Sequence, residues 1–253
     1  MEVTFQMFLI VCPLVFLAAA VDAIGGGGGL IALPAYMIAG LPTALAGGSN
    51  KLSACMGTTI ATFNYFRKGK IMLKPGLSAS LGALPGAWIG AQLLQQMDER
   101  FVRIFMLVAI PVVAVLLMLK KDAPAVARPM TTGRLFGCFA LGLGCGLYDG
   151  FFGPGTGTLL IMGLTYLIGM DMITAAGTAK LINLASNIAA LGSLITGGNV
   201  LFPLALPAIA FSITGGYLGS WLAMTKGAKF IRKIMLAVII LLIVKLAYDM
   251  IVG

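Results

Sequence analysis

Apolar runs separated by short polar turns fill this sequence from end to end. Ten such runs can be counted, at 5–24, 29–39, 43–66, 73–96, 101–119, 134–149, 157–169, 172–196, 201–223 and 229–251. Most of them approach or exceed the roughly 20 apolar residues that a membrane-spanning helix needs. The longest polar stretch, about 120–134, has the length of a linker. The pattern therefore predicts an all-α integral membrane protein with no separate soluble domain.

Two of the runs, 29–39 and 157–169, are too short to cross a membrane. At 1.5 Å per residue they reach only about 16–20 Å, whereas the hydrocarbon core is about 30 Å thick. Each run follows a glycine-rich loop, Gly25–Gly29 in one case and Gly153–Gly157 in the other. Irregular backbone survives at membrane depth only where protein or a water-filled cavity covers it. We therefore expect two broken helices whose glycine loops lie below the membrane surface.

A period near 129 residues relates the two parts of the chain. The matches are closest at glycine, aromatic, lysine and aspartate positions, and small shifts of one or two residues bring the glycine loops and aspartates into register. The matching sets are Lys51 with Lys180, Gly86–Gly90 with Gly215–Gly219, Gly25–Gly29 with Gly153–Gly157, and Asp22 with Asp149. The repeat predicts two membrane halves of about five segments each, 1–122 and 130–253.

Basic residues in the loops orient these halves. Lysine and arginine gather in three clusters, at 67–74, 120–134 and 226–233. All three fall on one face if the segments alternate, and the positive-inside rule makes that face cytoplasmic. Because five segments is an odd number, the second half enters the membrane inverted, and both termini are expected outside. Inverted repeats with broken helices are typical of secondary transporters.

Composition narrows the possible partners. Hydrophobic residues make up 60% of the chain and charged residues 10%, against roughly 25% charged residues in soluble domains. A net charge of +9 would suggest nucleic acid as the partner of a soluble protein. Here the charge lies in short loops, so we expect membrane lipid and no nucleic acid. The chain has no histidine and its four cysteines lie in apolar runs, so we expect neither a metal nor a cofactor.

The two glycine loops are candidate anion cradles. A glycine loop that opens a short helix exposes backbone N–H groups, and the helix dipole favours negative charge there. The candidate residues are Gly27, Gly28 and Gly29 in one half and Gly155, Thr156 and Gly157 in the other. The alternative is that glycine only allows close packing between helices. We favour packing for five other glycines, which are Gly82, Gly86, Gly90, Gly215 and Gly219.

Two lysines lie deep in apolar runs, Lys51 about eight residues inside one and Lys180 at the matching place in the other half. A charge at the bilayer centre costs at least about 2.5–3.5 kcal/mol, and such residues mark functional sites. The functional interpretation is an anion ligand, and the alternative is a buried salt bridge with Asp22 or Asp149. Several flanking side chains could donate hydrogen bonds to an oxyanion. They are Ser49, Asn50, Thr178, Asn183 and Asn187.

Asp22 and Asp149 stand just before the glycine loops. A carboxylate inside the membrane can relay protons or bind a coupling cation. It can also cap the free N–H groups of the loop or of the short helix. The sequence leaves these two interpretations open.

Several of these motifs resemble the TauE/SafE family of sulfite and organosulfonate transporters. The motifs are Gly25–Gly29 leading to Pro34, Gly48–Leu52, Arg67–Ile71, Gly150–Gly157, Gly177–Leu181 and Gly197–Val200. The resemblance implies a multi-pass permease of the prokaryotic cytoplasmic membrane for anions such as sulfite, sulfoacetate or other small sulfonates, in a family usually described as exporters. One departure is that the first loop is all glycine where the second has Pro154 and Thr156, so the two cradles need not be equivalent.

We therefore expect a secondary transporter that moves a small sulfur-containing anion by alternating access. Lys51 and Lys180 would neutralise the anion, the glycine loops would bind its oxygens, and Asp22 or Asp149 would couple it to protons. The alternatives are a passive anion channel, a transporter of another oxyanion or carboxylate, and a structural membrane subunit. An enzyme is not expected, because HExxH and GxSxG motifs are absent from the sequence.

Overall fold

The structure is a computed structural model that describes residues 3–98, 100–102, 105 and 129–252, with side chains as far as residue 227. Within these ranges the regular structure is helical, and no strand occurs. The helices are α1 (Phe5–Gly25), α2 (Gly29–Ile38), α3 (Thr43–Arg67), α4 (Leu73–Gln96), α6 (Thr132–Phe151), α7 (Thr156–Ile168), α8 (Met172–Thr196) and α9 (Phe202–Val252).

The helix lengths confirm an all-helical membrane protein with two short helices. The helices α2 and α7 have 10 and 13 residues, and each follows its glycine loop as the sequence predicts. Among the described residues, four helices are long and apolar enough to cross a membrane: α1, α4, α8 and the part of α9 up to Gly227. The predicted runs 201–223 and 229–251 join in α9, which breaks at Gly227, where φ is 75°.

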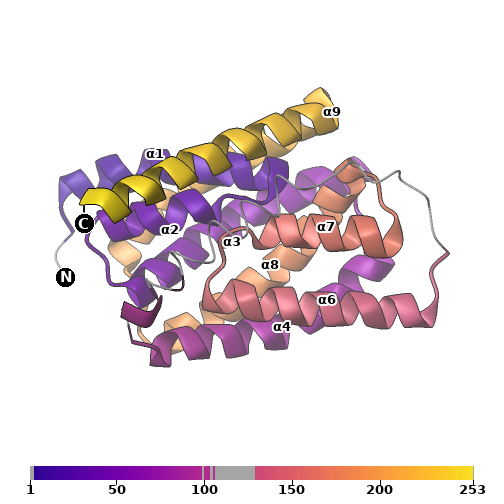
Figure 1. Ribbon diagram of the computed structural model, residues 1–253, viewed down its shortest axis with the longest axis horizontal. Coiled ribbons are helices and arrows are strands. Elements are labelled where there is room, and N and C mark those ends of the chain that lie inside the picture. Colours follow the sequence, from indigo (N-terminus) through magenta and orange to yellow (C-terminus); the bar gives the residue numbers. More distant parts are fainter. Residues whose placement is uncertain (1–2, 99, 103–104, 106–128, 253) are drawn as a thin grey trace.

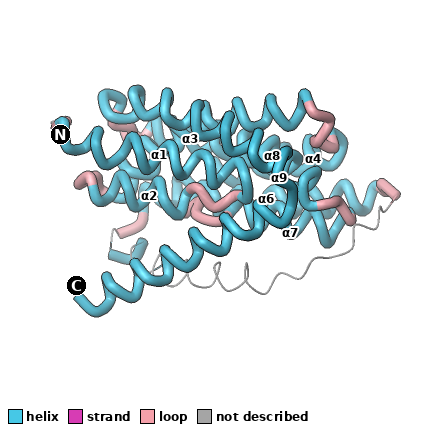
Figure 2. The backbone as a smooth tube through the Cα atoms, turned by 90° about the horizontal axis from the view of Figure 1, so that it is seen from above, coloured by secondary structure: helices cyan, strands magenta, loops and turns pink. Residues whose placement is uncertain are grey.

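Three sequence predictions involve residues outside the described ranges. Most of the run 101–119 lies there, and so do the basic residues at 120–128 and most of the predicted boundary between the halves at 122–130. The N and C marks lie at the same end of the bundle in both views (Figures 1 and 2). The chain therefore returns to the end from which it started.

The outer helices form two pairs, with α1 beside α9 at one edge and α4 beside α6 at the other (Figure 1). Glycines make the α4–α6 contact close. A Cβ added at Gly86 would lie 2.3 Å from the Leu143 carbonyl oxygen, and one at Gly82 or Gly90 would be equally close to the α6 backbone. Gly215 and Gly219 approach the α1 backbone in the same way, at 2.2 Å. Close packing is thus confirmed as the role of these five glycines.

Helices α3 and α8 lie between these pairs, and each of them contacts a turn from the other sequence half. A Cβ added at Gly48, near the start of α3, would lie 1.8 Å from the carbonyl oxygen of Asn199. A Cβ added at Gly177, near the start of α8, would lie 2.1 Å from the carbonyl oxygen of Lys70. The two contacts involve positions that the sequence repeat matches. The turn that follows α8 therefore packs against α3, and the turn that follows α3 packs against α8.

Asp171 is the N-cap residue of α8. Its carboxylate accepts hydrogen bonds from the backbone N–H groups of Ile173 and Thr174, at 3.0 and 3.1 Å. Partial burial raises the pKa of this carboxyl, but the hydrogen bonds and the nearby Lys70 charge outweigh burial, so the pKa lies below its ordinary value. The ionised form is therefore the stabilising form of the cap.

We predict that Asp171→Ala lowers the free energy of unfolding by about 0.5–2 kcal/mol at neutral pH, because alanine cannot cap the helix. A lowered pKa contributes stability above the unfolded-state pKa, and this stability is lost as pH falls through the folded-state pKa. The difference from wild type should therefore shrink on acidification below about pH 4, the ordinary range of an aspartate. Thermal unfolding of both proteins in detergent at several pH values measures this difference in stability. A difference that does not change with pH would contradict the role of ionised Asp171 as the helix cap.

Candidate functional site

The two glycine loops touch at the centre of the bundle. A Cβ added at Gly26 would lie 2.3 Å from the carbonyl carbon of Gly157. The hydroxyl of Thr158 donates to the carbonyl of Gly25, with 2.8 Å between oxygens. Gly26 also has φ of 85°, in the left-handed region that favours glycine. Glycine is required here because two backbones meet directly, so the broken helices α2 and α7 begin at one shared point.

Two ion pairs lie beside this point. The Nζ of Lys51 on α3 is 2.7 Å from Oδ2 of Asp149 on α6, and the Nζ of Lys180 on α8 is 2.6 Å from Oδ2 of Asp22 on α1. Each lysine therefore pairs with the aspartate of the other sequence half. Both aspartates stand in the last turn of a helix, where the dipole disfavours negative charge, so the lysines compensate them. The salt bridges that the sequence left as an alternative are present in this conformation.

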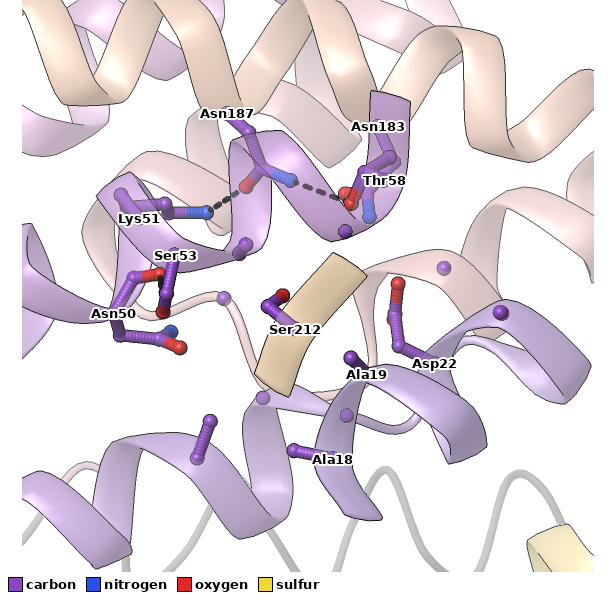
Figure 3. Close-up of a pocket in the computed structure, with 18 of the residues that line it drawn as sticks. Ala18, Ala19, Asp22, Asn50, Lys51, Ser53, Thr58, Asn183, Asn187 and Ser212 are labelled. Atoms are coloured by element: carbon purple, nitrogen blue, oxygen red, sulfur yellow. Dashed lines mark hydrogen bonds between the residues drawn. The ribbon is translucent and has the colours of Figure 1, made fainter. Parts of the chain in front are cut away.

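The Lys51–Asp149 pair belongs to a larger hydrogen-bonded network. Lys51 also donates to Oδ1 of Asn187 at 2.8 Å, and the hydroxyl of Ser186 donates to Oδ2 of Asp149 at 2.7 Å. Asn187 in turn donates to the hydroxyl of Thr58 at 3.4 Å, and Figure 3 shows this chain of contacts from Lys51 to Thr58. The Lys180–Asp22 pair has no corresponding network among the described residues. The two pairs are thus alike in partners and different in surroundings.

A small polar cavity opens between the two ion pairs. It leaves about 50 Å³ for water-sized molecules, which is room for several waters or one small anion. All three of Lys51, Asp22 and Ser212 line this space, and Figure 3 shows Lys51 and Asp22 on opposite sides of it. The predicted site residues that line it are Asp22, Gly28, Gly29, Asn50, Lys51, Asp149, Gly157, Asn183 and Asn187.

A second, narrower cavity lies on another side of Lys51. It leaves about 10 Å³, close to the space that one water needs. Asn50, Lys51 and Asp149 line both cavities, and Thr43 and Phe152 line the second one only. The Lys51–Asp149 ion pair therefore borders both spaces.

Six predicted site residues do not line the larger cavity. Lys180 is fully buried behind Asp22. The hydroxyls of Ser49 and Thr178 accept hydrogen bonds from the backbone N–H groups of Leu201 and Met72, at 2.9 and 3.0 Å. These two residues therefore fix the turns that follow α8 and α3. Gly27, Gly155 and Thr156 lie within the loops, where the Thr156 hydroxyl donates to the Gly153 carbonyl. Neither aspartate caps loop N–H groups with its carboxylate among the described contacts.

Asn183 is the most exceptional polar residue of the cavity. The residue is 6% exposed, and its Oδ1 has no hydrogen-bond partner among the described residues. A buried polar group without a partner costs about 1–3 kcal/mol. Its amide borders the cavity in Figure 3. An amide oxygen accepts hydrogen bonds, so this atom suits water or a ligand group that donates one, whereas the Nδ2 group is the part of the amide that can donate to an anion.

The sequence did not single out Ser53, Thr58, Ser186 or Ser212. Ser186 reaches Asp149, and the other three line the larger cavity. Serine and threonine are common in the interiors of membrane helices, so their identity alone carries little signal. Spacing would not have singled out Ser186 either, because six residues after Lys180 correspond to about 600°, which places it about 120° away from that lysine around the helix.

Broken helices that meet at buried charges around a polar cavity are typical of membrane-embedded solute transporters. The sequence model of the family described as "Sulfite exporter TauE/SafE" matches residues 11–246, so this chain belongs to that family. The resemblance noted in the sequence is thereby confirmed. No solved structure matches the chain.

Curated relatives carry the same kind of name. A "Probable membrane transporter protein" of Haemophilus influenzae is 32% identical over 98% of this chain and 98% of its own length. "Probable membrane transporter protein YfcA" of Escherichia coli is 33% identical over 97% of this chain and 94% of its own length. The chain is thus a membrane transporter rather than an enzyme, and a multi-pass protein of the bacterial inner membrane.

Proposed function

We propose that this protein is a secondary transporter that carries sulfite or a small organosulfonate across the inner membrane, together with a proton, by alternating access. The observation that supports the proposal best is the charge of the central cavity. The two lysines and two aspartates around it form two closed ion pairs, so the site is polar and yet neutral. The family description supports a sulfur oxyanion as the substrate.

The cavity offers hydrogen-bond donors to such an anion. An ammonium group has three donors, and the described residues provide acceptors for two of those of Lys51, on Asp149 and Asn187. The third donor is available to a ligand in the cavity that Lys51 lines. The side-chain amide of Asn183 borders the same space and adds a second donor. Both groups suit the oxygens of a sulfite or sulfonate head.

Charge balance supports coupling to a proton. A monovalent anion, such as a sulfonate or hydrogen sulfite, adds one uncompensated negative charge to a neutral buried site, which is costly in a low dielectric. A proton that enters with the anion and binds Asp22 or Asp149 neutralises one carboxylate. The lysine of that pair then compensates the anion. The cavity is thus neutral both when empty and when it holds one anion and one proton.

Reciprocal contacts support an inverted repeat and alternating access. Lys51 matches Lys180 in the sequence repeat, and Asp149 matches Asp22. The ion pair Lys51–Asp149 therefore has its counterpart in Lys180–Asp22, with the roles of the two halves reversed. Two such halves can rock about a central site, which opens it to one side of the membrane and then to the other. The Lys51–Asp149 pair borders both cavities, so we place the barrier between the two openings there.

A binding screen tests the proposed substrate class. Purified protein in detergent is titrated with sulfite, thiosulfate, sulfoacetate, taurine and the carboxylate analogue of each sulfonate. We expect saturable binding of sulfite or of a sulfonate, with weaker binding of the matched carboxylate. Stronger binding of the carboxylates would favour the alternative of a carboxylate transporter.

We predict that Asn183→Ala weakens binding of the preferred anion about 10- to 100-fold, because a hydrogen bond to a charged group contributes roughly 1.5–3 kcal/mol. Asn199→Ala is the matched control, since Asn199 lies in the turn after α8 and bonds Gln95 there. Isothermal titration measures both variants. Equal loss of affinity in the two variants, or none in Asn183→Ala, would remove Asn183 from the site.

A further inference from the structure

We propose that Asp22, and not Asp149, carries the coupled proton. This inference rests on the proposed function, because it assigns the proton to one of the two carboxylates in the same cavity. The sequence repeat makes the two aspartates equivalent, whereas their contacts in the structure differ. That difference decides between them.

The Asp149 carboxylate accepts hydrogen bonds from two helices. Its Oδ2 accepts hydrogen bonds from Lys51 at 2.7 Å and from the Ser186 hydroxyl at 2.7 Å. Its side chain is 4% exposed. Hydrogen bonds donated to a carboxylate favour its charged form, and a proton on this oxygen would disrupt both of them. Asp149 is therefore a fixed counter-ion of Lys51.

Asp22 has fewer contacts and more access. Among the described residues only Lys180 donates to its carboxylate, at 2.6 Å. Its side chain is 20% exposed and lines the larger cavity. Gly57 occupies the position that matches Ser186 in the sequence repeat, and glycine has no hydroxyl to donate. A Cβ at Gly57 would lie 2.3 Å from the Ser212 hydroxyl oxygen, so packing excludes a serine there.

The groups that face Asp22 also permit it to take a proton. Lys180 on α8 is its only ion-pair partner within the described residues. Tyr65 on α3 lies nearby and donates its hydroxyl to the Ala23 carbonyl, so it does not donate to the carboxylate in this structure. Lys51 and Asp149 line the same cavity but neutralise each other. Within the part of the chain that the structure describes, only the Lys180 charge thus opposes a proton on Asp22.

Lys180 takes part in anion binding through Asp22, although Lys180 itself does not line the cavity. When Asp22 takes a proton from water, the fully buried Lys180 ammonium loses its counter-charge. An anion in the cavity then replaces that counter-charge across the neutral carboxyl group. When the anion leaves, Asp22 releases its proton and the ion pair reforms. Proton and anion therefore enter and leave in a ratio of one to one, and the O–H bond of the Asp22 carboxyl is the one bond that forms and breaks.

The test counts protons per anion with ethanesulfonate, a strong-acid anion that binds no proton itself in the pH range used. Full-length protein in weakly buffered detergent solution is mixed with ethanesulfonate, and a pH dye reports proton uptake while isothermal titration reports bound anion. We expect wild type to take up one proton per anion and its affinity to fall with rising pH. Asp22→Asn mimics the protonated carboxyl, so it should bind ethanesulfonate with no proton uptake and no pH dependence.

Two variants complete the test. Ser186→Ala removes a donor from Asp149 and leaves Asp22 untouched, so the pH midpoint of proton uptake should stay at the wild-type value. Ser78→Ala, whose hydroxyl bonds the Leu135 carbonyl between α4 and α6, controls for nonspecific effects. A shifted midpoint in Ser186→Ala alone would overturn the assignment. Proton uptake by Asp22→Asn, or its failure to bind ethanesulfonate at any pH, would overturn it too. A wild-type protein that binds no sulfur oxyanion would instead refute the proposed function.

Discussion

Lys51→Met is expected to abolish anion transport and to lower the free energy of unfolding by about 3–5 kcal/mol, because it leaves a buried carboxylate without its partner. Lys51 pairs with Asp149 and donates to Asn187. The substitution also removes the donor that we assign to the anion. Uptake of radiolabelled sulfonate into liposomes measures the first effect, and thermal unfolding in detergent measures the second.

The double variant Lys51→Met with Asp149→Asn separates the structural role of the lysine from its functional role. It leaves no uncompensated charge, so most of the lost stability should return. Transport should remain absent, because the proposed anion ligand is still missing. A double variant that regains both stability and transport would show that Lys51 serves only as half of a salt bridge.

The second large effect is expected at the contact between the glycine loops. We predict that Gly26→Ala prevents assembly of the transporter and that no anion transport remains. The added Cβ would lie 2.3 Å from the Gly157 backbone and 2.5 Å from that of Thr158. Backbone atoms cannot move aside as a flexible side chain can, so the two broken helices would have to separate. Size-exclusion profile, thermal unfolding and uptake measure the result.

Gly40→Ala is a matched control, because it isolates the cost of the backbone conformation. Gly40 has φ of 94°, and a Cβ added there would meet no neighbouring group within 4 Å, whereas Gly26 has φ of 85° and a crowded site. A left-handed alanine costs about 1–2 kcal/mol, so Gly40→Ala should fold and transport. Equal behaviour of the two variants would mean that the loop contact is unimportant.

The short helices could be predicted from the sequence because their length is recorded directly in the hydropathy pattern. The run predicted at 29–39 is the helix Gly29–Ile38, and the run predicted at 157–169 is the helix Thr156–Ile168. The glycine loops mark where each broken helix begins. No tertiary information is needed for these features, since hydrophobic length and helix-breaking residues are local.

The sequence could not predict which site residues line the cavity and which bind neighbouring backbone, because this depends on how each helix is rotated about its axis. Ser49 and Lys51 are two residues apart, and two residues correspond to about 200° around a helix. Lys51 therefore lines the cavity while Ser49 binds the backbone of Leu201. The matching residues Thr178 and Lys180 also have different partners, since Thr178 binds the backbone of Met72 and Lys180 donates to Asp22. Choosing between salt bridge and ligand likewise required the distance from each lysine to its aspartate.

The central claim is that the neutral cavity carries one anion with one proton. Its most direct test is uptake of radiolabelled ethanesulfonate by liposomes that contain only the purified protein. The membrane potential is clamped at zero, and the interior is kept one pH unit more alkaline than the outside. We predict about tenfold accumulation inside, because one pH unit corresponds to 1.36 kcal/mol per proton. Equal concentrations on both sides at steady state would contradict the claim and identify a passive anion channel.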